Sequence, residues 1–419
     1  MRYMKQSGFE WIGEIPSHWK VVRTKYNFTN TKQIVGGCVD EFERLALTMK
    51  GVVKRSKDDN IGLQPEKFET YQILRNNELV FKLIDLQNVA TSRVGLSHDD
   101  GIVSPAYIII HPNGEILPQF AEKFFWMMWK NEIFNALGDT GVRSSLNNRE
   151  LLNISIAFPD VLEQRRIVDF LDLKCAKIDI LISDIQTQIN ILEQYKRSVV
   201  VEVITNGINS DVEKKDSGIQ WIGMVPKHWD CKRGKYILKY IQKPIFEDDG
   251  VITCFRDGEV TLRSNRREDG FTMADKEIGY QGIDIGDLVV HGMDGFAGAI
   301  GISDSRGKAS PVLNVLDTEQ NKKYIMYFLR SMAYSDVFLA LATGIRVRSC
   351  DLRWNKLAEL SYPLPPIDEQ EAIVKYIDDI IAKTNVLIVN KKQQLEKLEA
   401  YKKSLIYEYV TGKKEAPIQ

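Results

Sequence analysis

One long phrase of this sequence occurs twice, and the duplication limits the folds open to the chain more than any other feature. SGFEWIGEIPSHWK begins at Ser7 and SGIQWIGMVPKHWD begins at Ser217; we call residues 7–19 and 217–229 the WIG motifs. A second pair, YKRSVVVEVIT at 195–205 and YKKSLIYEYVT at 401–411, recurs at a similar distance. This period is too long for a solenoid repeat, so it indicates duplication of a whole domain with its connecting segment.

Each copy ends in a segment with helical heptad spacing. Residues 167–204 contain neither Gly nor Pro, and Ile178, Ile185 and Leu192 recur every seven residues. Leu181 and Tyr195 are predicted to lie on the neighbouring row of the same helix. The second copy carries a matching set: Ile381, Ile388, Leu395, Leu398 and Leu405. Two such helices are expected to pack on each other as a coiled coil, each roughly 57 Å long at about 1.5 Å per residue.

Short runs rich in Val, Ile and Tyr, separated by turn signals such as Asn113-Gly114 and Asp249-Gly250, predict an α+β fold for the globular blocks. The duplication predicts two globular domains separated by a pair of long antiparallel coiled-coil helices, related by a pseudo-twofold internal repeat. The predicted segments are 1–160 and 208–366 for the globular domains, and 161–207 and 367–412 for the helices. Amphipathic helices over 119–137 and 320–341 are expected in the globular cores. By symmetry each WIG motif lies near the end of the opposite long helix, where Trp11, Pro16, Trp19, Trp221, Pro226 and Trp229 attach the domain to the helices.

The composition excludes several classes of protein. A net charge of -1 gives no global basic field, so any nucleic-acid surface must be local. The five cysteines show no CxxC spacing, which argues against a zinc knuckle and fits a reducing cytoplasm. No signal peptide or membrane-spanning run is predicted, and we expect no membrane partner.

Catalytic signatures are missing from the pattern. The only Pro-Pro, Pro365-Pro366, lacks the Asn or Asp and the aromatic residue of an amino-methyltransferase motif. GISDSRGKA at 301–309 has the wrong spacing for a phosphate-binding loop and ends in Ala309 instead of Ser or Thr. We therefore predict a non-catalytic chain with no catalytic residue, no metal site and no cofactor of its own.

The repeated motifs resemble those of the specificity (S) subunits of type I restriction–modification enzymes, over the whole chain. The resemblance rests on the two WIG motifs, on Thr140-Gly141-Val142-Arg143 and Thr343-Gly344-Ile345-Arg346, and on the EQ-x-x-IV helix entries after Pro159 and Pro366. It implies a DNA-binding subunit of a restriction system used in phage defence, with two target-recognition domains that each read half of a bipartite, asymmetric sequence in double-stranded DNA. It also implies two methyltransferase (M) and two motor/nuclease (R) subunits as partners, on which S-adenosylmethionine, ATP and Mg act in DNA methylation and cleavage.

Base recognition needs side chains that form paired hydrogen bonds with base edges, and phosphate positioning needs Lys and Arg. The candidates in the first block are Lys54, Arg55, Lys82, Arg93 and Arg143. Those in the second block are Arg263, Arg266, Arg267, His291, Arg346 and Arg348. Each could instead belong to a solvated loop or to a structural ion pair.

Two alternatives remain at this point. A coiled-coil scaffold that binds only protein would share the helices but show no DNA sequence preference. A single-chain restriction–methylation enzyme would need several hundred further residues before the first WIG motif.

Overall fold

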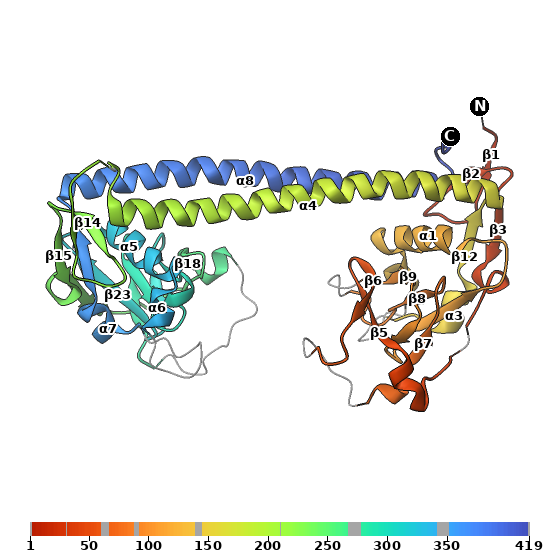
Figure 1. Cartoon of the computed structure of the whole chain (residues 1–419), viewed down its shortest axis with the longest axis horizontal. Helices are drawn as coiled ribbons and strands as arrows, with labels where there is room; N and C mark the ends of the chain where they lie inside the picture. Colours follow the sequence, from red (N-terminus) through yellow and green to blue (C-terminus); the bar gives the residue numbers. More distant parts are fainter. Residues whose placement is uncertain are drawn as a thin grey trace. The chain divides into compact units, whose positions relative to one another are not determined.

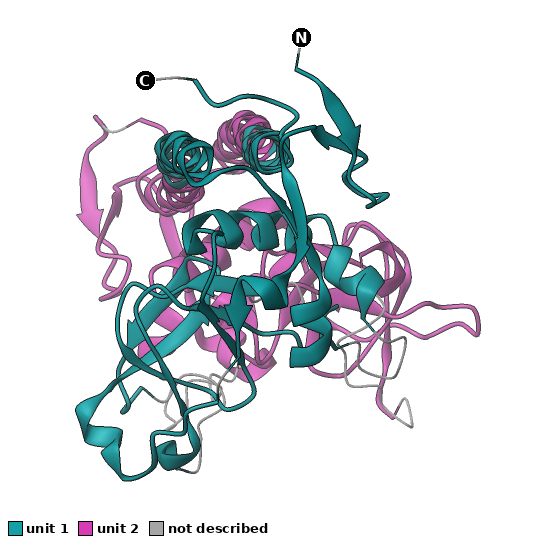
Figure 2. Cartoon of the chain, turned by 90° about the vertical axis from the view of Figure 1, so that its right-hand side faces the viewer, with its two compact units in different colours: residues 1–185, 393–419 teal, residues 186–392 magenta. Residues whose placement is uncertain are grey.

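A computed structural model describes residues 2–30, 32–59, 67–87, 92–138, 145–209, 211–266, 278–341 and 352–417. The chain forms two compact units, residues 1–185 with 393–419 and residues 186–392, which are coloured separately in Figure 2. We call them the first and second unit. Each contains a β-rich globular part and a portion of two long helices, α4 (Val161–Asn206) and α8 (Ile367–Val410) (Figure 1).

The first unit is built on two four-stranded sheets, ordered β6-β5-β10-β7 and β4-β11-β8-β9, and two short ladders, β1-β2 and β12-β3. All strand pairs are antiparallel except β5 with β10. Its strands are β1 (Met4–Gln6), β2 (Glu14–Pro16), β3 (Lys20–Arg23), β4 (Phe28–Thr29), β5 (Glu43–Thr48), β6 (Gly51–Arg55), β7 (Gln72–Leu74), β8 (Leu79–Phe81), β9 (Val94–Leu96), β10 (Gly101–Val103), β11 (Ile108–Pro112) and β12 (Ser155–Phe158). Its shorter helices are α1 (Pro118–Lys130), α2 (Ile133–Leu137), α3 (Asn148–Asn153) and the 3-10 turns η1 (Thr24–Tyr26), η2 (Gly36–Glu41) and η3 (Phe68–Thr70).

The second unit repeats part of this plan. Its four-stranded sheet, β16-β23-β20-β21, corresponds to β4-β11-β8-β9, and its ladder β15-β24 corresponds to β3-β12. Its strands are β13 (Lys214–Asp216), β14 (Met224–Pro226), β15 (Asp230–Arg233), β16 (Leu238–Ile241), β17 (Ile252–Cys254), β18 (Val260–Leu262), β19 (Gln281–Ile283), β20 (Leu288–His291), β21 (Ile300–Ile302), β22 (Gly307–Ala309), β23 (Leu313–Thr318) and β24 (Ser361–Leu364). Its shorter helices are α5 (Lys322–Tyr334), α6 (Val337–Ala340), α7 (Trp354–Glu359), η4 (Gly234–Tyr236), η5 (Arg263–Asn265) and η6 (Gly295–Ala297).

The aromatic helices lie in the cores, as expected from their spacing. Phe120 and Phe124 of α1, and Phe328 of α5, are fully or almost fully buried. The structure corrects one detail, because each predicted single helix is two helices. Glu132 and Asp336, at equivalent positions, adopt left-handed backbone conformations that end α1 and α5 and begin the short helices α2 and α6.

The long helices pack on each other and run in opposite directions within the first unit. The Phe170 and Tyr409 ring centroids are 4.6 Å apart, and Lys402 Nζ lies 2.6 Å from Asp179 Oδ1. As residue numbers rise along α4, the residues of α8 in contact with them have falling numbers, so the two helices are antiparallel here. Within the second unit, Lys196 Nζ donates to Asn385 Oδ1 at 2.9 Å. The prediction of two heptad helices that pack together is confirmed.

The heptad positions named from the sequence are buried or half-buried on these helices. Ile178 is 6% exposed and Ile388 is 4% exposed, while the side chains of Ile185, Leu192, Leu395 and Leu398 are half-buried. The second row on α4 was predicted wrongly, because Leu181 and Tyr195 are half-exposed at 50% and 49%. Ile182 and Ile189 form that row, four residues after each member of the first row rather than three. No helix in the described ranges combines the length and apolarity needed to cross a bilayer.

Candidate nucleic-acid interface and its attachment to the helices

Each WIG motif binds the first turn of the long helix that follows its own domain. His18 Nε2 lies 2.8 Å from Glu163 Oε2, and the Trp19 indole N–H donates to Glu163 Oε1 at 3.3 Å. Arg2 also pairs with Glu163. The second unit repeats the pattern, with His228 at 2.8 Å and the Trp229 indole at 3.1 Å from the Glu369 carboxylate. One carboxylate thus satisfies the buried indole of each motif, which would otherwise lose a hydrogen bond.

The same motifs also reach the end of the other long helix. In the first unit, Lys413 Nζ donates to the Glu14 carbonyl at 2.6 Å and Tyr407 to the Trp11 carbonyl at 3.3 Å. Gly412, which follows α8, approaches Pro16 so closely that a Cβ would lie 2.4 Å from its ring. In the second unit Gly207 ends α4 beside Trp229 and Pro226. Each motif therefore lies at a junction of the globular part, one helix start and one helix end.

A glutamine beside each of these carboxylates joins the long helix to the shorter core helix. Gln164 accepts from the Leu117 N–H at the start of α1 at 2.8 Å and donates to the Glu115 and Pro159 carbonyls. Gln370 accepts from the Asn321 N–H at the start of α5 at 3.0 Å. In the sequence the repeated Glu-Gln pair indicates only a family motif at the helix entries. The recurrence of Glu-Gln in both copies is the one sequence feature that could have indicated that these residues join the helices.

In the first unit, Lys54 and Arg55 lie at the end of β6 and line a hollow of about 600 Å³. Both are held by acids: Lys54 Nζ lies 3.2 Å from Asp99 and Arg55 Nε lies 2.6 Å from Asp59. The hydrogen bond to Asp59 raises the pKa of Arg55. The Lys54–Asp99 pair is exposed, so it costs little to exchange for a phosphate, whereas the Arg55–Asp59 pair is half-buried.

The position of Arg93 does not fit the predicted role in DNA contact. Its side chain is 1% exposed, and its guanidinium donates to the carbonyls of Lys82, Ile84 and Asp85. Burial lowers its pKa. Arg93 therefore holds the turn after β8 in place and is not available to DNA in this structure. Lys82, at the start of that turn, is half-buried.

In the second unit, three predicted residues lie together. Arg263, Arg266 and His291 line a hollow of about 780 Å³ beside the β17–β18 hairpin. Arg266 packs its guanidinium 4.2 Å from the Phe255 ring centroid and pairs with Asp257 at 2.6 Å. Arg263 Nε lies 3.4 Å from Thr253 Oγ1. A planar guanidinium held on an aromatic ring is oriented for two-pronged contact with a base edge or a phosphate.

His291 has a structural role in this hollow. Its Nδ1 accepts the backbone N–H groups of Met293 and Asp294 at 3.2 and 2.9 Å. Burial lowers the pKa of His291 more than the nearby Asp294 carboxylate raises it. The neutral ring therefore fixes the turn after β20.

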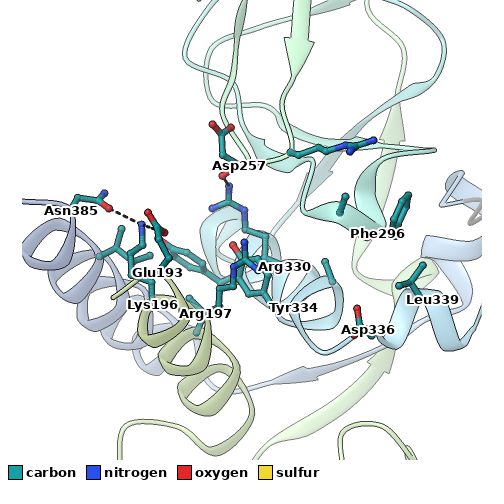
Figure 3. A pocket seen from close by; sticks show the side chains of 16 residues that line it. Glu193, Lys196, Arg197, Asp257, Phe296, Arg330, Tyr334, Asp336, Leu339 and Asn385 are labelled. Atoms are coloured by element: carbon teal, nitrogen blue, oxygen red, sulfur yellow. Dashed lines mark hydrogen bonds and ion pairs between the residues drawn. The ribbon is translucent and has the colours of Figure 1, made fainter. Parts of the chain in front are cut away.

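Arg330 of α5 positions the β17–β18 hairpin, and the sequence analysis did not identify it. Its Nε donates to the Ile300 carbonyl at 2.8 Å and its NH2 group to the Asp257 carbonyl at 2.6 Å. Figure 3 shows Arg330 reaching Asp257 at the edge of a hollow of about 720 Å³. The Asp257 carboxylate in turn holds Arg266, so a core helix is linked to a candidate DNA-contacting side chain.

The remaining candidates, Arg143, Arg267, Arg346 and Arg348, lie outside the described residues. Within the described ranges, no cluster of three or more His, Cys, Asp or Glu side chains could hold a metal ion.

Comparison with known proteins gives consistent full-length matches. The chain is 20% identical over 99% of its length to a Methanocaldococcus jannaschii protein described as a type I restriction enzyme MjaX specificity subunit, of which 98% is covered. It is 22% identical over 99% of its length to the type I restriction enzyme MjaVIII specificity subunit of the same organism, of which 97% is covered. No family model matches the chain.

A solved structure shares the fold. A chain from a study of complex assembly and conformational transition of the type I R-M system superposes with a TM-score of 0.66 at 15% identity, covering 95% of this chain and 99% of that one. Over its full length the chain is thus similar in sequence to type I restriction enzyme specificity subunits, and it shares the fold of a chain from a type I R-M system.

Proposed function

We propose that this chain recognises a bipartite, asymmetric DNA sequence, one half with each unit, and directs methyltransferase and motor/nuclease subunits to it. The observation that carries the proposal is a contrast within the duplication. The junctions built on Glu163 and Glu369 are nearly identical, whereas the candidate DNA-contacting edges, β5–β6 and β17–β18, differ in sequence and in pairing. Two equivalent supports that carry different contact surfaces suit two different half-sites.

In this proposal residues 1–160 and 208–366 contact DNA, while 161–207 and 367–412 set the spacer between the half-sites. Arg55, Arg263 and Arg266 supply guanidinium groups for guanine edges or phosphates, and Lys54 and Lys82 supply phosphate contacts. Arg143, Arg267, Arg346 and Arg348 remain proposed contacts, and His291 lines the second contact surface. Arg93 is excluded by its burial.

The long helices also support the partner subunits. Exposed apolar side chains occur on the first unit's portion of the helices at Ile180, Leu181 and Tyr401, and on the second unit's portion at Ile191, Tyr195, Val386, Leu387 and Val389. We infer that these exposed apolar side chains of α4 and α8 contribute to protein interaction surfaces. We assign them to two methyltransferase subunits, with two motor/nuclease subunits in the cleaving complex; S-adenosylmethionine, ATP and Mg act on those partners.

The net charge of residues 231–360 affects how tightly the chain is expected to bind DNA. Residues 231–360 contain 19 Lys and Arg against 18 Asp and Glu, a net charge of +1. Since phosphate contacts supply much of the affinity of DNA-binding proteins, we expect the isolated chain to bind weakly and the methyltransferase partners to strengthen binding.

A mobility-shift titration tests the function against the alternative of a protein-only scaffold. The chain with its methyltransferase partner is titrated into target-containing and random duplexes at several salt concentrations. We expect tighter binding to the target at every salt concentration and affinity that falls as salt rises. Equal affinity for both duplexes would refute sequence recognition, and nanomolar binding by the isolated chain in physiological salt would refute the assigned contribution of the partners.

A further inference from the structure

Two exposed corners of the chain carry the same residues. The Tyr26 corner comprises Arg23, Lys25 and Tyr26 at η1, and the Tyr236 corner comprises Arg233, Lys235 and Tyr236 at η4. Tyr26 is 66% exposed and Tyr236 is 74% exposed. In both corners the lysine Nζ lies 5.5 Å from the centroid of the following tyrosine ring. The two corners thus present the same cationic and aromatic surface.

If packing alone kept the two corners alike, their buried residues would be identical and their exposed residues would differ. The opposite is found. Within residues 23–28 and 233–238, the buried or half-buried positions differ between the copies: Thr24, Asn27 and Phe28 against Gly234, Ile237 and Leu238. The three exposed positions of these six-residue stretches are identical. The 3-10 turns do not need these side chains, since neither turn has a side-chain cap. An external partner common to both units explains the identity better than folding does.

Local ion pairing does not account for the basic residues either. In the second unit Arg233 and Lys235 both pair with Glu359, at 2.9 and 3.3 Å. The equivalent position in the first unit is Asn153, and among the described residues Arg23 and Lys25 have no carboxylate partner. The first unit keeps both cations without the acid that they contact in the second.

An apolar hollow adjoins the Tyr26 corner. Five apolar side chains line a space of about 400 Å³ together with three polar residues: Phe9, Trp11, Leu137, Leu146 and Ile154, with Glu150, Asn153 and Ser155. Ser155 is paired with Arg23 in the β3–β12 ladder, so the corner and the hollow share an edge. Leu137 is 48% exposed, and its counterpart Leu341 in the second unit is 46% exposed. The Arg23 and Lys25 cations beside this hollow complement a protein surface that offers an apolar side chain with acids on the side of the corner.

The position of each corner favours protein over DNA. In Figure 1, β3, which leads into the Tyr26 corner, lies on the opposite side of the first unit from β6, which carries Lys54 and Arg55. Likewise β15, which leads into the Tyr236 corner, lies across the second unit from β18, which precedes Arg263. The corners therefore face away from the proposed base contacts.

We propose that the two corners are equivalent docking sites for two copies of one protein, the methyltransferase subunit, through an acidic surface around an apolar side chain. This inference rests on the proposed function and adds a second contact to that on the long helices.

The test uses the full chain and the methyltransferase subunit of the same system. Native mass spectrometry and a binding titration compare wild type with K25E/Y26A, with K235E/Y236A and with the four-fold variant. The control is Lys67→Glu, an exposed charge reversal in the first unit away from the corner, and thermal melting checks that every variant is folded. We expect each double variant to weaken one of the two binding steps at least tenfold, the loss typical of removing a central tyrosine, and the four-fold variant to weaken both.

Two results would overturn the inference alone: wild-type binding of both copies by all corner variants, or unchanged partner binding with weaker binding to DNA of any sequence. The second would make the corners phosphate contacts. If the wild-type chain bound no methyltransferase subunit, the proposed function itself would fail.

Discussion

The β17–β18 hairpin of the second unit depends on single residues, and Gly258 shows this most clearly. Its φ is +87°, and a Cβ at this position would overlap the Arg330 guanidinium, which bonds two carbonyls. Gly258→Ala should therefore displace Arg330 as well as strain the backbone. Gly286, with φ +85° and open space around it, is the matched control for strain alone. We expect Gly258→Ala to lower the free energy of unfolding by about 1–3 kcal/mol more than Gly286→Ala in urea denaturation. An equal loss in both variants, or the same difference in an Arg330→Met background, would contradict this role of Arg330.

His291 should make the stability of the chain depend on pH. Because burial lowers its pKa in the folded state, the unfolded chain takes up this proton first as pH falls. The stabilising contribution of the neutral ring is thus complete above its ordinary pKa of about 6.5 and is lost as pH falls towards the lower folded value. Asn can accept the same two backbone N–H groups without titrating. Thermal melting at several pH values between neutral and weakly acidic should show a steeper loss for wild type than for His291→Asn, and parallel curves would show that His291 does not titrate in this way.

At the scale of elements, the heptad assignment predicts a strong contrast between two neighbouring isoleucines of α4. Ile178 is 6% exposed and packs in the core of the first unit, whereas Ile180 is 61% exposed. Ile178→Ala should cost about 2–5 kcal/mol, as expected for deleting a buried aliphatic side chain, and Ile180→Ala should cost less than about 0.5 kcal/mol. Denaturation of the isolated chain measures both. Similar losses would mean that the packing face of α4 is assigned wrongly.

The helices were easier to predict from the sequence than the contacts between their residues. Heptad periodicity predicted the two long helices, α4 and α8. It did not separate Leu181 from Ile182 as the second contact row, because spacings of three and four residues both bring side chains to one helix face. It could not show that Arg93 points inward, since an arginine beside a strand suits a carbonyl-lined turn as well as a phosphate. The Glu163 and Glu369 contacts join residues 145 and 140 positions apart, so they could be seen only in the folded chain.

The whole molecule should recognise its two half-sites separately. The structure supports this because each globular part has its own core and is joined to the long helices through its own WIG motif. Replacing residues 231–360 with the corresponding block of another specificity subunit keeps Trp229 and Glu369. Of the two DNA-contact surfaces it changes only the second, and it also exchanges the Tyr236 corner. The two half-sites should then change independently.

Methylome sequencing of a host that carries this chain with its methyltransferase partners, before and after that replacement, is the most direct test of recognition by two units. The account predicts a methylated motif with two defined halves and an unspecified spacer, of which one half changes after the replacement while the other half and the spacer stay the same. A single contiguous motif, or a change in both halves together, would contradict it.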